Sequence, residues 1–238
     1  MQTKGTFMKM KTLFSAAAVL TGSLLAAQAS PSDDVTAAAQ KLSGESSYSW
    51  HMTVVVPEDS QFKPGPTEGK TADGLIYVKM TFGDNTTEIY KQGTNAAITN
   101  PDGGWQSLAD VAASQGRGRF MAGMVRNYRL PAAQVTDIIA GCKDLEETNG
   151  AFASDLTDDG AKKLLQFRRG GNADISNPSG SAMFWVKDGE LTKIEYHVKG
   201  TVSFNGNDMD VDRDTTVVIS DVGSTKIEVP DDAKKLLP

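Results

Sequence analysis

The segment FWVKDGELTKIEYHV, residues 184–198, decides the fold. Its centre, Asp188-Gly189, favours the tight turn of a two-residue β-hairpin, and the flanking residues alternate between apolar and polar. Such a turn pairs Trp185 with Thr192 across the two strands. Five apolar side chains are then expected on one face of the hairpin: Met183, Trp185, Ile194, Tyr196 and Val198. The opposite face is expected to carry Phe184, Lys193, Glu195 and His197. An apolar face of this size needs a second layer that covers it.

Strand patterns recur elsewhere in the chain. In residues 49–56 the apolar side chains of Trp50, Met52 and Val54 share one face. Further short strands are expected at residues 75–82, 86–91, 95–99, 215–220 and 225–229. Helical patterns lie at residues 33–42, 131–139 and 160–167, with short, glycine-broken helices in 105–128. Residues 57–74 are rich in proline, glycine and charge, which indicates a long exposed connection. The chain is therefore expected to form an α+β fold with an antiparallel sheet.

The first 29 residues have the pattern of a secretory signal peptide. Three lysines precede an apolar run from Leu13 to Leu25, which is too short for a comfortable membrane span. Ala27-Gln28-Ala29 offers small residues at a cleavage site, so we expect cleavage after Ala29. The sequence then predicts a single domain over residues 30–238, located in the periplasm or secreted, with no membrane-spanning segment once the signal is removed. The alternative is an anchor helix that is retained.

Charge and cysteine content limit the partners. The formal net charge is −6, and the signal segment holds lysines but no acid, so the remaining chain is more acidic still. Nucleic acid and anionic membrane surfaces require concentrated positive charge, and we expect neither as the main partner. Cys142 is the single cysteine, so no internal disulfide can form and packing must supply the stability. A buried, inert thiol is expected, with intermolecular pairing as the alternative.

The sequence offers little for catalysis. Its two histidines, His51 and His197, lie on the expected outer faces of strands, and no nucleophile, zinc or phosphate-loop motif accompanies them. Four aspartates alternate along one segment and resemble the start of a calcium loop: Asp208, Asp210, Asp212 and Asp214. The glycine and glutamate that such a loop requires are replaced by Arg213 and Ile219. We therefore expect a solvated column of acids, no metal, no cofactor and no catalytic residues.

Two motifs carry a resemblance to a known group. WVKDGELTKIEYHVKG, residues 185–200, and TTVVISDVGSTKIEVP, residues 215–230, follow an early helix and strand, a Gly103-Gly104-Trp105 strand end and a helical insert. In this order the chain resembles the bacterial carriers of the outer-membrane lipoprotein carrier type and their mycobacterial lipoprotein relatives. The resemblance implies a curved antiparallel sheet, an unclosed half-barrel, with helices packed on its concave face. It also implies an acyl chain held between the sheet and the helices.

The resemblance leads to an expected ligand site. A cavity between the sheet and the helices would be lined by Trp50, Met52, Val54, Met121, Met124, Val125, Met183, Trp185, Ile194 and Tyr196. Flexible methionines suit a cavity that accepts varied chains, although ordinary core filling would use them equally well. The first hypothesis is an exported, non-enzymatic protein of the bacterial envelope that binds a lipid or acylated ligand. The alternatives are a structural module with a dry core that contacts an envelope protein, and a hydrolase with an unrecognised catalytic set.

Overall fold

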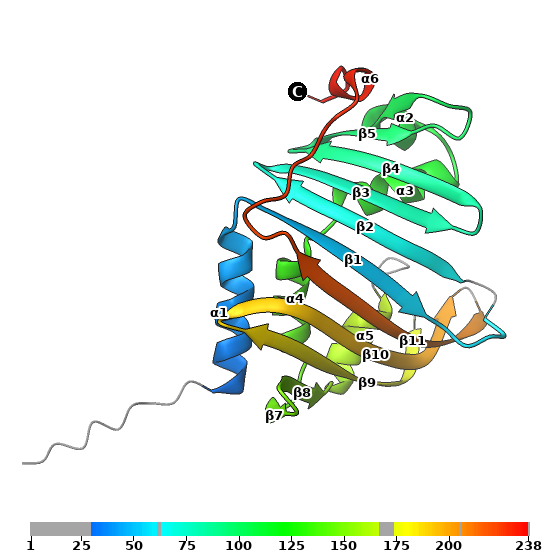
Figure 1. Ribbon diagram of the computed structural model, residues 1–238. Coiled ribbons are helices and arrows are strands. Elements are labelled where there is room, and N and C mark those ends of the chain that lie inside the picture. The colour runs from blue at the N-terminus through cyan, green and yellow to red at the C-terminus, as the bar shows by residue number, and fades with distance from the viewer. Residues whose placement is uncertain (1–29, 61–62, 167–173, 205, 238) are drawn as a thin grey trace, which may run out of the picture.

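The chain folds around one large antiparallel sheet. The computed structural model describes residues 30–60, 63–166, 174–204 and 206–237; the expected signal peptide and its cleavage after Ala29 lie outside them. The strands are β1 (Ser47–Val55), β2 (Pro64–Ala72), β3 (Leu75–Phe82), β4 (Asn85–Gln92), β5 (Asn95–Thr99), β6 (Trp105–Ser107), β7 (Glu146–Thr148), β8 (Ala151–Asp155), β9 (Asp174–Lys187), β10 (Glu190–Phe204) and β11 (Asn207–Ser220). Their order in the 11-stranded sheet is β6-β5-β4-β3-β2-β1-β11-β10-β9-β8-β7. Strands β6 and β7 are edges, so the sheet does not close into a barrel (Figure 1).

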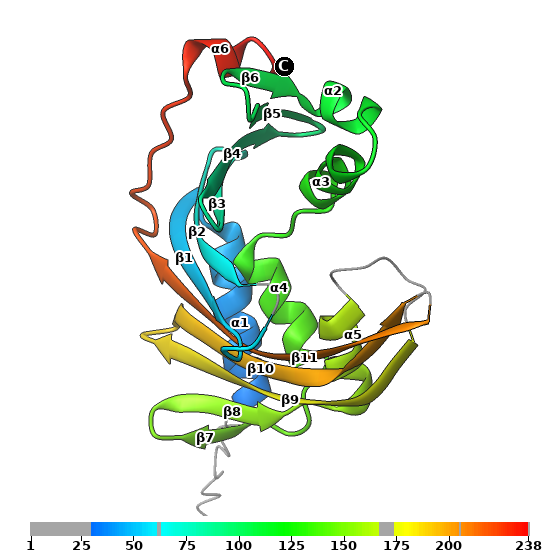
Figure 2. The same ribbon diagram turned by 90° about the vertical axis from the view of Figure 1, so that its right-hand side faces the viewer.

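Helices flank the curved sheet, most of them on its concave side. They are α1 (Pro31–Gly44), α2 (Leu108–Ala113), α3 (Arg117–Arg126), α4 (Pro131–Ile139), α5 (Asp158–Gln166) and α6 (Asp231–Lys234). Figure 2 shows α2, α3, α4 and α5 on the concave side, with α6 at the outer rim. Helix α1 packs against α4 and against β9 and β10. The expected α+β half-barrel with helices on its concave face is confirmed.

Local sequence signals explain where the helices begin. Ser30 and Asp33 form a reciprocal capping box at the start of α1, and Pro31 occupies its first turn. The helix then buries side chains at helical spacing: Val35, Ala38, Ala39 and Leu42. Pro131 opens α4 as the sequence predicts. The glycine-broken segment after Trp105 forms the two short helices α2 and α3, also as expected.

The expected exposed connection over residues 57–74 is wrong. Pro64–Ala72 forms strand β2 between β1 and β3, although it is rich in proline, glycine and threonine. Gly69 pairs with Trp50, and a Cβ atom at this position would overlap the indole ring. Glycine is therefore required in the strand because a large side chain from the next strand occupies the space above it.

The expected strand over residues 225–229 is also wrong. The C-terminal segment runs over the outer face of the sheet to α6 (Figure 1). Ile227, Val229 and Ala233 pack there against a cluster that contains Tyr90 and Ala97. An aromatic row on the same face joins Tyr77, Tyr90 and Trp105, with ring centroids 4.9 and 5.3 Å apart. The alternating apolar residues of this segment thus cover the sheet instead of joining it.

A β-bulge changes the opening hairpin. The turn forms as expected and pairs Lys187 with Glu190, but the register shifts between Leu191 and Lys193. Thr192 is the extra residue, so Lys193 pairs with Trp185 and Ile194 pairs with Phe184. Because each one-residue shift moves every side chain to the other face, Met183 and Trp185 do not share a face with Ile194 and Tyr196. The predicted distribution of side chains on β9 is therefore wrong.

Candidate functional site

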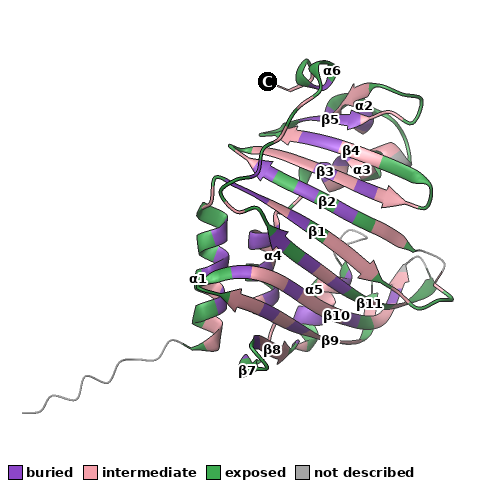
Figure 3. Cartoon of the chain, viewed as in Figure 1, coloured by how far each residue is buried: buried purple, intermediate pink, exposed green. Residues whose placement is uncertain are grey.

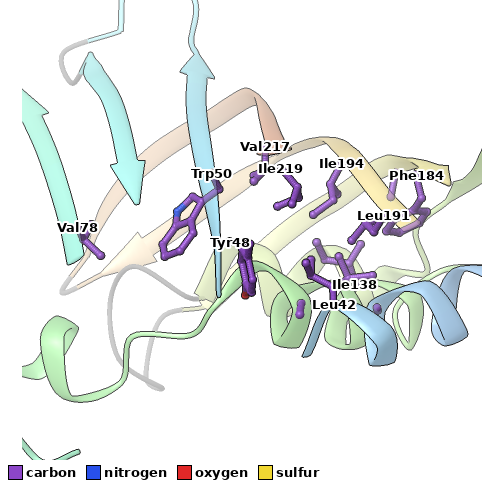
Figure 4. Packing of buried hydrophobic residues seen from close by; sticks show 14 of the residues in the cluster. Leu42, Tyr48, Trp50, Val78, Ile138, Phe184, Leu191, Ile194, Val217 and Ile219 are labelled. Carbon is purple, nitrogen blue, oxygen red and sulfur yellow. The ribbon is translucent and has the colours of Figure 1, made fainter. Parts of the chain in front are cut away.

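The concave face of the sheet is lined by an apolar row from neighbouring strands. Antiparallel pairing places Trp50 beside Ile219, Met52 beside Val217, and Val217 beside Ile194. Figure 4 shows Trp50, Ile194, Val217 and Ile219 pointing from the sheet toward the helices. From Val211 to Ser220 of β11, more buried residues alternate with more exposed ones, as expected when one face packs and the other meets water (Figure 3). The site residues predicted on β1 and β10 are thus brought to one surface.

Trp50 lies at the centre of this surface. Its indole is 4% exposed, lies over Gly69 and approaches Tyr48 at a ring-centroid distance of 5.7 Å. Tyr128, which follows α3, stacks on it at 6.4 Å. Burial raises the pKa of the Tyr128 phenol far above its ordinary value. The Trp50–Tyr128 stack therefore connects the sheet to the helical insert.

Helix α3 supplies the predicted partners from the opposite side. Val125 is 1% exposed, whereas Met121 and Met124 remain partly buried, and all three belong to the same apolar cluster as Trp50. Met52 and Tyr196 are likewise only partly buried in that cluster. Val54 lies next in the row, paired with Thr215, and is also partly buried. Eight of the ten predicted lining residues thus come together on the concave side: Trp50, Met52, Val54, Met121, Met124, Val125, Ile194 and Tyr196.

The other two predicted residues, Met183 and Trp185, lie on the convex face. The bulge at Thr192 moves them there, and the Lys193 ammonium lies 3.5 Å from the centroid of the Trp185 ring. This is a cation–π contact at a partly exposed site. Their place in the concave core is taken by Phe184, which is fully buried. The expected concave placement of Met183 and Trp185 is therefore wrong.

A pocket of about 300 Å³ lies between the end of α1, the end of β2 and the start of α4. It is lined by Ser43, Glu45, Ser46, Tyr48, Thr71, Asp73, Gly74, Leu130, Ala132 and Ala133. Burial raises the pKa of Tyr48 to about 12. The Ala132 N–H lies near the Tyr48 hydroxyl but outside hydrogen-bonding geometry, and this hydroxyl has no hydrogen-bond partner in the described structure. None of the ten predicted residues lines this pocket, although Tyr48 adjoins Trp50.

Arg213 is a concave-face residue that the sequence analysis did not identify as part of a site. It pairs with Val198, which is fully buried, and its Nη2 donates a hydrogen bond of 2.8 Å to the Leu164 carbonyl in the last turn of α5. Burial lowers the pKa of the guanidinium. The signal was present in the sequence, because Arg213 alternates with aspartates that face water and must therefore point inward.

The candidate catalytic and metal residues lie on the outer surface. His197 Nδ1 is 2.9 Å from Asp214, and its Nε2 is 3.6 Å from Asp212. Hydroxyls of Thr201 and Ser203 bond the next two acids of the column, at 2.8 and 2.6 Å. The four aspartates are exposed, as the sequence predicts. Within the described ranges, no group of three or more His, Cys, Asp and Glu residues is arranged to hold a metal ion.

In the described part of the chain, no helix combines the length and apolar character needed to cross a membrane. Cys142 is partly buried, and burial raises the pKa of its thiol to about 11.

Comparison with solved structures gives distant matches, which include two mycobacterial proteins. The lipoprotein LppX of Mycobacterium tuberculosis matches with 10% identity and a TM-score of 0.46, over 83% of this chain and 97% of that chain. LprF from Mycobacterium bovis matches with 10% identity and a TM-score of 0.48, over 85% of this chain and 97% of that chain. No family model matches the sequence, and the search of curated proteins gives no match.

Proposed function

We propose that the protein is an exported, non-enzymatic binding protein that holds a lipid or acylated ligand against the concave face of its sheet. One observation carries this proposal. Apolar side chains from separate elements converge on the concave face yet remain only partly buried: Met52, Met121, Met124 and Tyr196. They belong to the same apolar cluster as Trp50 and Tyr128, whose rings stack between the sheet and the segment that follows α3. The signal-peptide pattern of residues 1–29 supports export to the periplasm or beyond.

The energetics favour an apolar ligand at such a surface. Burial of an acyl chain contributes about 0.8 kcal/mol per methylene, so ten buried methylenes contribute roughly 8 kcal/mol before ordering costs. No catalytic group is needed for useful affinity. The flexible thioethers of Met121 and Met124 can repack around chains of different shape.

A matched pair of substitutions tests the proposed surface. Met52 and Met183 are both partly buried strand residues, but Met52 faces the concave side and Met183 the convex side. Met52→Gln should weaken binding of a fluorescent fatty acid about fivefold, because roughly 1 kcal/mol of apolar burial is lost. Met183→Gln should leave the affinity unchanged. Equal effects of both substitutions would contradict the proposal.

Native mass spectrometry provides an independent test. Protein purified from its host without detergent should carry additional mass that corresponds to a bound acyl ligand. A uniformly ligand-free protein that also ignores fluorescent fatty-acid probes would remove the proposal.

A second candidate is a structural module of the envelope that contacts another protein and has a fully packed interior. The packed core favours it, since 34 apolar residues of the described chain are buried, and the 300 Å³ pocket has none of the predicted apolar lining. If native mass spectrometry finds no bound acyl ligand and the protein does not bind the fluorescent fatty acid, this alternative is supported.

A further inference from the structure

The concave row of β11 changes from apolar to charged along its length. Starting from the end nearest the β1 tryptophan, its inward residues are Ile219, Val217, Thr215 and Arg213. Six residues of strand span about 20 Å, which is comparable to an extended long-chain acyl group. Ile219, Val217 and Thr215 are themselves buried, so the apolar part of a ligand would lie beside their partly buried neighbours Met52 and Tyr196, with its other end at Arg213.

Among the described residues, the Arg213 guanidinium has few hydrogen-bond partners. Its one hydrogen bond within the described structure goes to the Leu164 carbonyl, and a guanidinium has five N–H donors. All Asp and Glu residues of the chain lie in the described ranges, and none of their carboxylate oxygens lies within 4.0 Å of this guanidinium. A partly buried positive charge without a carboxylate is costly to a fold unless a partner compensates it.

Arg213 lies among buried residues and is not an exposed surface charge. Val198, across the strand pair, is fully buried, and Thr215, the next inward residue on β11, is 2% exposed. Tyr196 pairs with Thr215 and is only partly buried. Gly200 lets Leu165 of α5 approach the sheet closely, which holds the C-terminal end of α5 beside Arg213.

We propose that Arg213 binds the carboxylate of a free fatty acid whose chain lies on the concave face. This inference rests on the proposed function and adds the charge and the orientation of the ligand. The planar fork of a guanidinium matches the two oxygens of a carboxylate, and a single positive charge balances a single negative one. A simpler structural role, in which Arg213 only bonds the last turn of α5, is tested by the same experiment.

The experiment compares cis-parinaric acid with its methyl ester at pH 7.5, measured by probe fluorescence. The two probes share the chain and differ in the carboxylate. The protein should bind the acid about tenfold more tightly than the ester. Arg213→Met should abolish this preference, Arg213→Lys should keep part of it, and Lys199→Met, which removes an exposed charge on the convex face, should leave it unchanged.

The possible outcomes distinguish the role of Arg213 from the proposed binding of an acyl ligand. Equal binding of acid and ester by the unmodified protein, or an unchanged preference in Arg213→Met, would overturn the role of Arg213 and leave the proposed function standing. Absence of binding of both probes would overturn both. A structural role alone would lower the melting temperature of Arg213→Met without changing the acid-to-ester ratio. Because the comparison of the two probes needs no variant, the inference can be refuted even if a substitution prevents folding.

Discussion

Replacement of Gly69 by alanine should destabilise the protein, although alanine is ordinarily the better residue. The backbone at Gly69 does not require positive φ, so the substitution should otherwise raise the free energy of unfolding by about 0.4–1 kcal/mol. The added Cβ, however, would overlap Cε2 and Cζ2 of the Trp50 indole, far inside the 3.0 Å that Cβ contacts essentially never go below. The buried indole is confined by Tyr48 and Tyr128 and cannot move away freely. Overpacking of this kind costs about 1–3 kcal/mol.

Urea unfolding, followed by circular dichroism, measures this loss. The matched control is Gly44→Ala in α1, where no atom lies within 4 Å of the new Cβ; this change should leave stability unchanged or raise it. In a Trp50→Leu background the loss of stability caused by Gly69→Ala should fall below about 0.5 kcal/mol, because the indole ring that the new Cβ would overlap has been removed. The same loss in both backgrounds, or a stabilising Gly69→Ala, would refute the placement of the indole over β2.

Three further predictions concern buried groups. Burial raises the pKa of Tyr48 to about 12, so the stability that its protonated phenol contributes is complete below pH 10 and is lost as the pH rises through 12. An alkaline titration followed by circular dichroism should show unfolding between these pH values. Tyr48→Phe should move the unfolding transition to higher pH. A pKa of about 11 for the Cys142 thiol should slow its reaction with thiol reagents at pH 8 by about a hundredfold relative to the urea-unfolded chain. Equal rates in the folded and unfolded chains would show that the thiol is accessible and has the pKa of a free cysteine. Ala233→Asp would bury a charge against Tyr90 and Ala97, so it should destabilise the protein by about 1–3 kcal/mol and make the C-terminal segment sensitive to protease. An unchanged digestion pattern would contradict the packing of the C-terminal segment on the outer face of the sheet.

Local patterns in the sequence were sufficient for much of the fold. Asp188-Gly189 set the hairpin turn, Pro131 began α4, and the alternating apolar residues of β1 reached the concave face. These features depend on neighbours in the sequence, and local chemistry determines them.

The features that were missed depend on contacts between distant segments. The extra residue at Thr192 belongs to the pairing of two long strands, and it moved Met183 and Trp185 to the outside. Gly69 made β2 look like a loop, because its reason for being glycine is an indole from another strand. The apolar residues Ile227 and Val229 have the spacing of a strand but cover Tyr90 and its neighbours from outside.

Part of the candidate site could be predicted from the sequence alone. The inward direction of Arg213 follows from its alternation with Asp212 and Asp214, and this pattern needs no structure. The absence of a carboxylate near Arg213 can be established only from the structure, because it depends on the position of every Asp and Glu residue.

Quenching of single tryptophans by a brominated fatty acid tests the ligand surface most directly. The three tryptophans report on different places: Trp50 on the concave face, and Trp105 and Trp185 on the outer face. Bromine quenches indole fluorescence at close contact, so one variant should retain only Trp50 and a matched variant only Trp185. Saturable quenching of Trp50, with Trp185 unaffected, is the expected result. Quenching of neither residue, or equal quenching of both, would contradict an acyl ligand on the concave face.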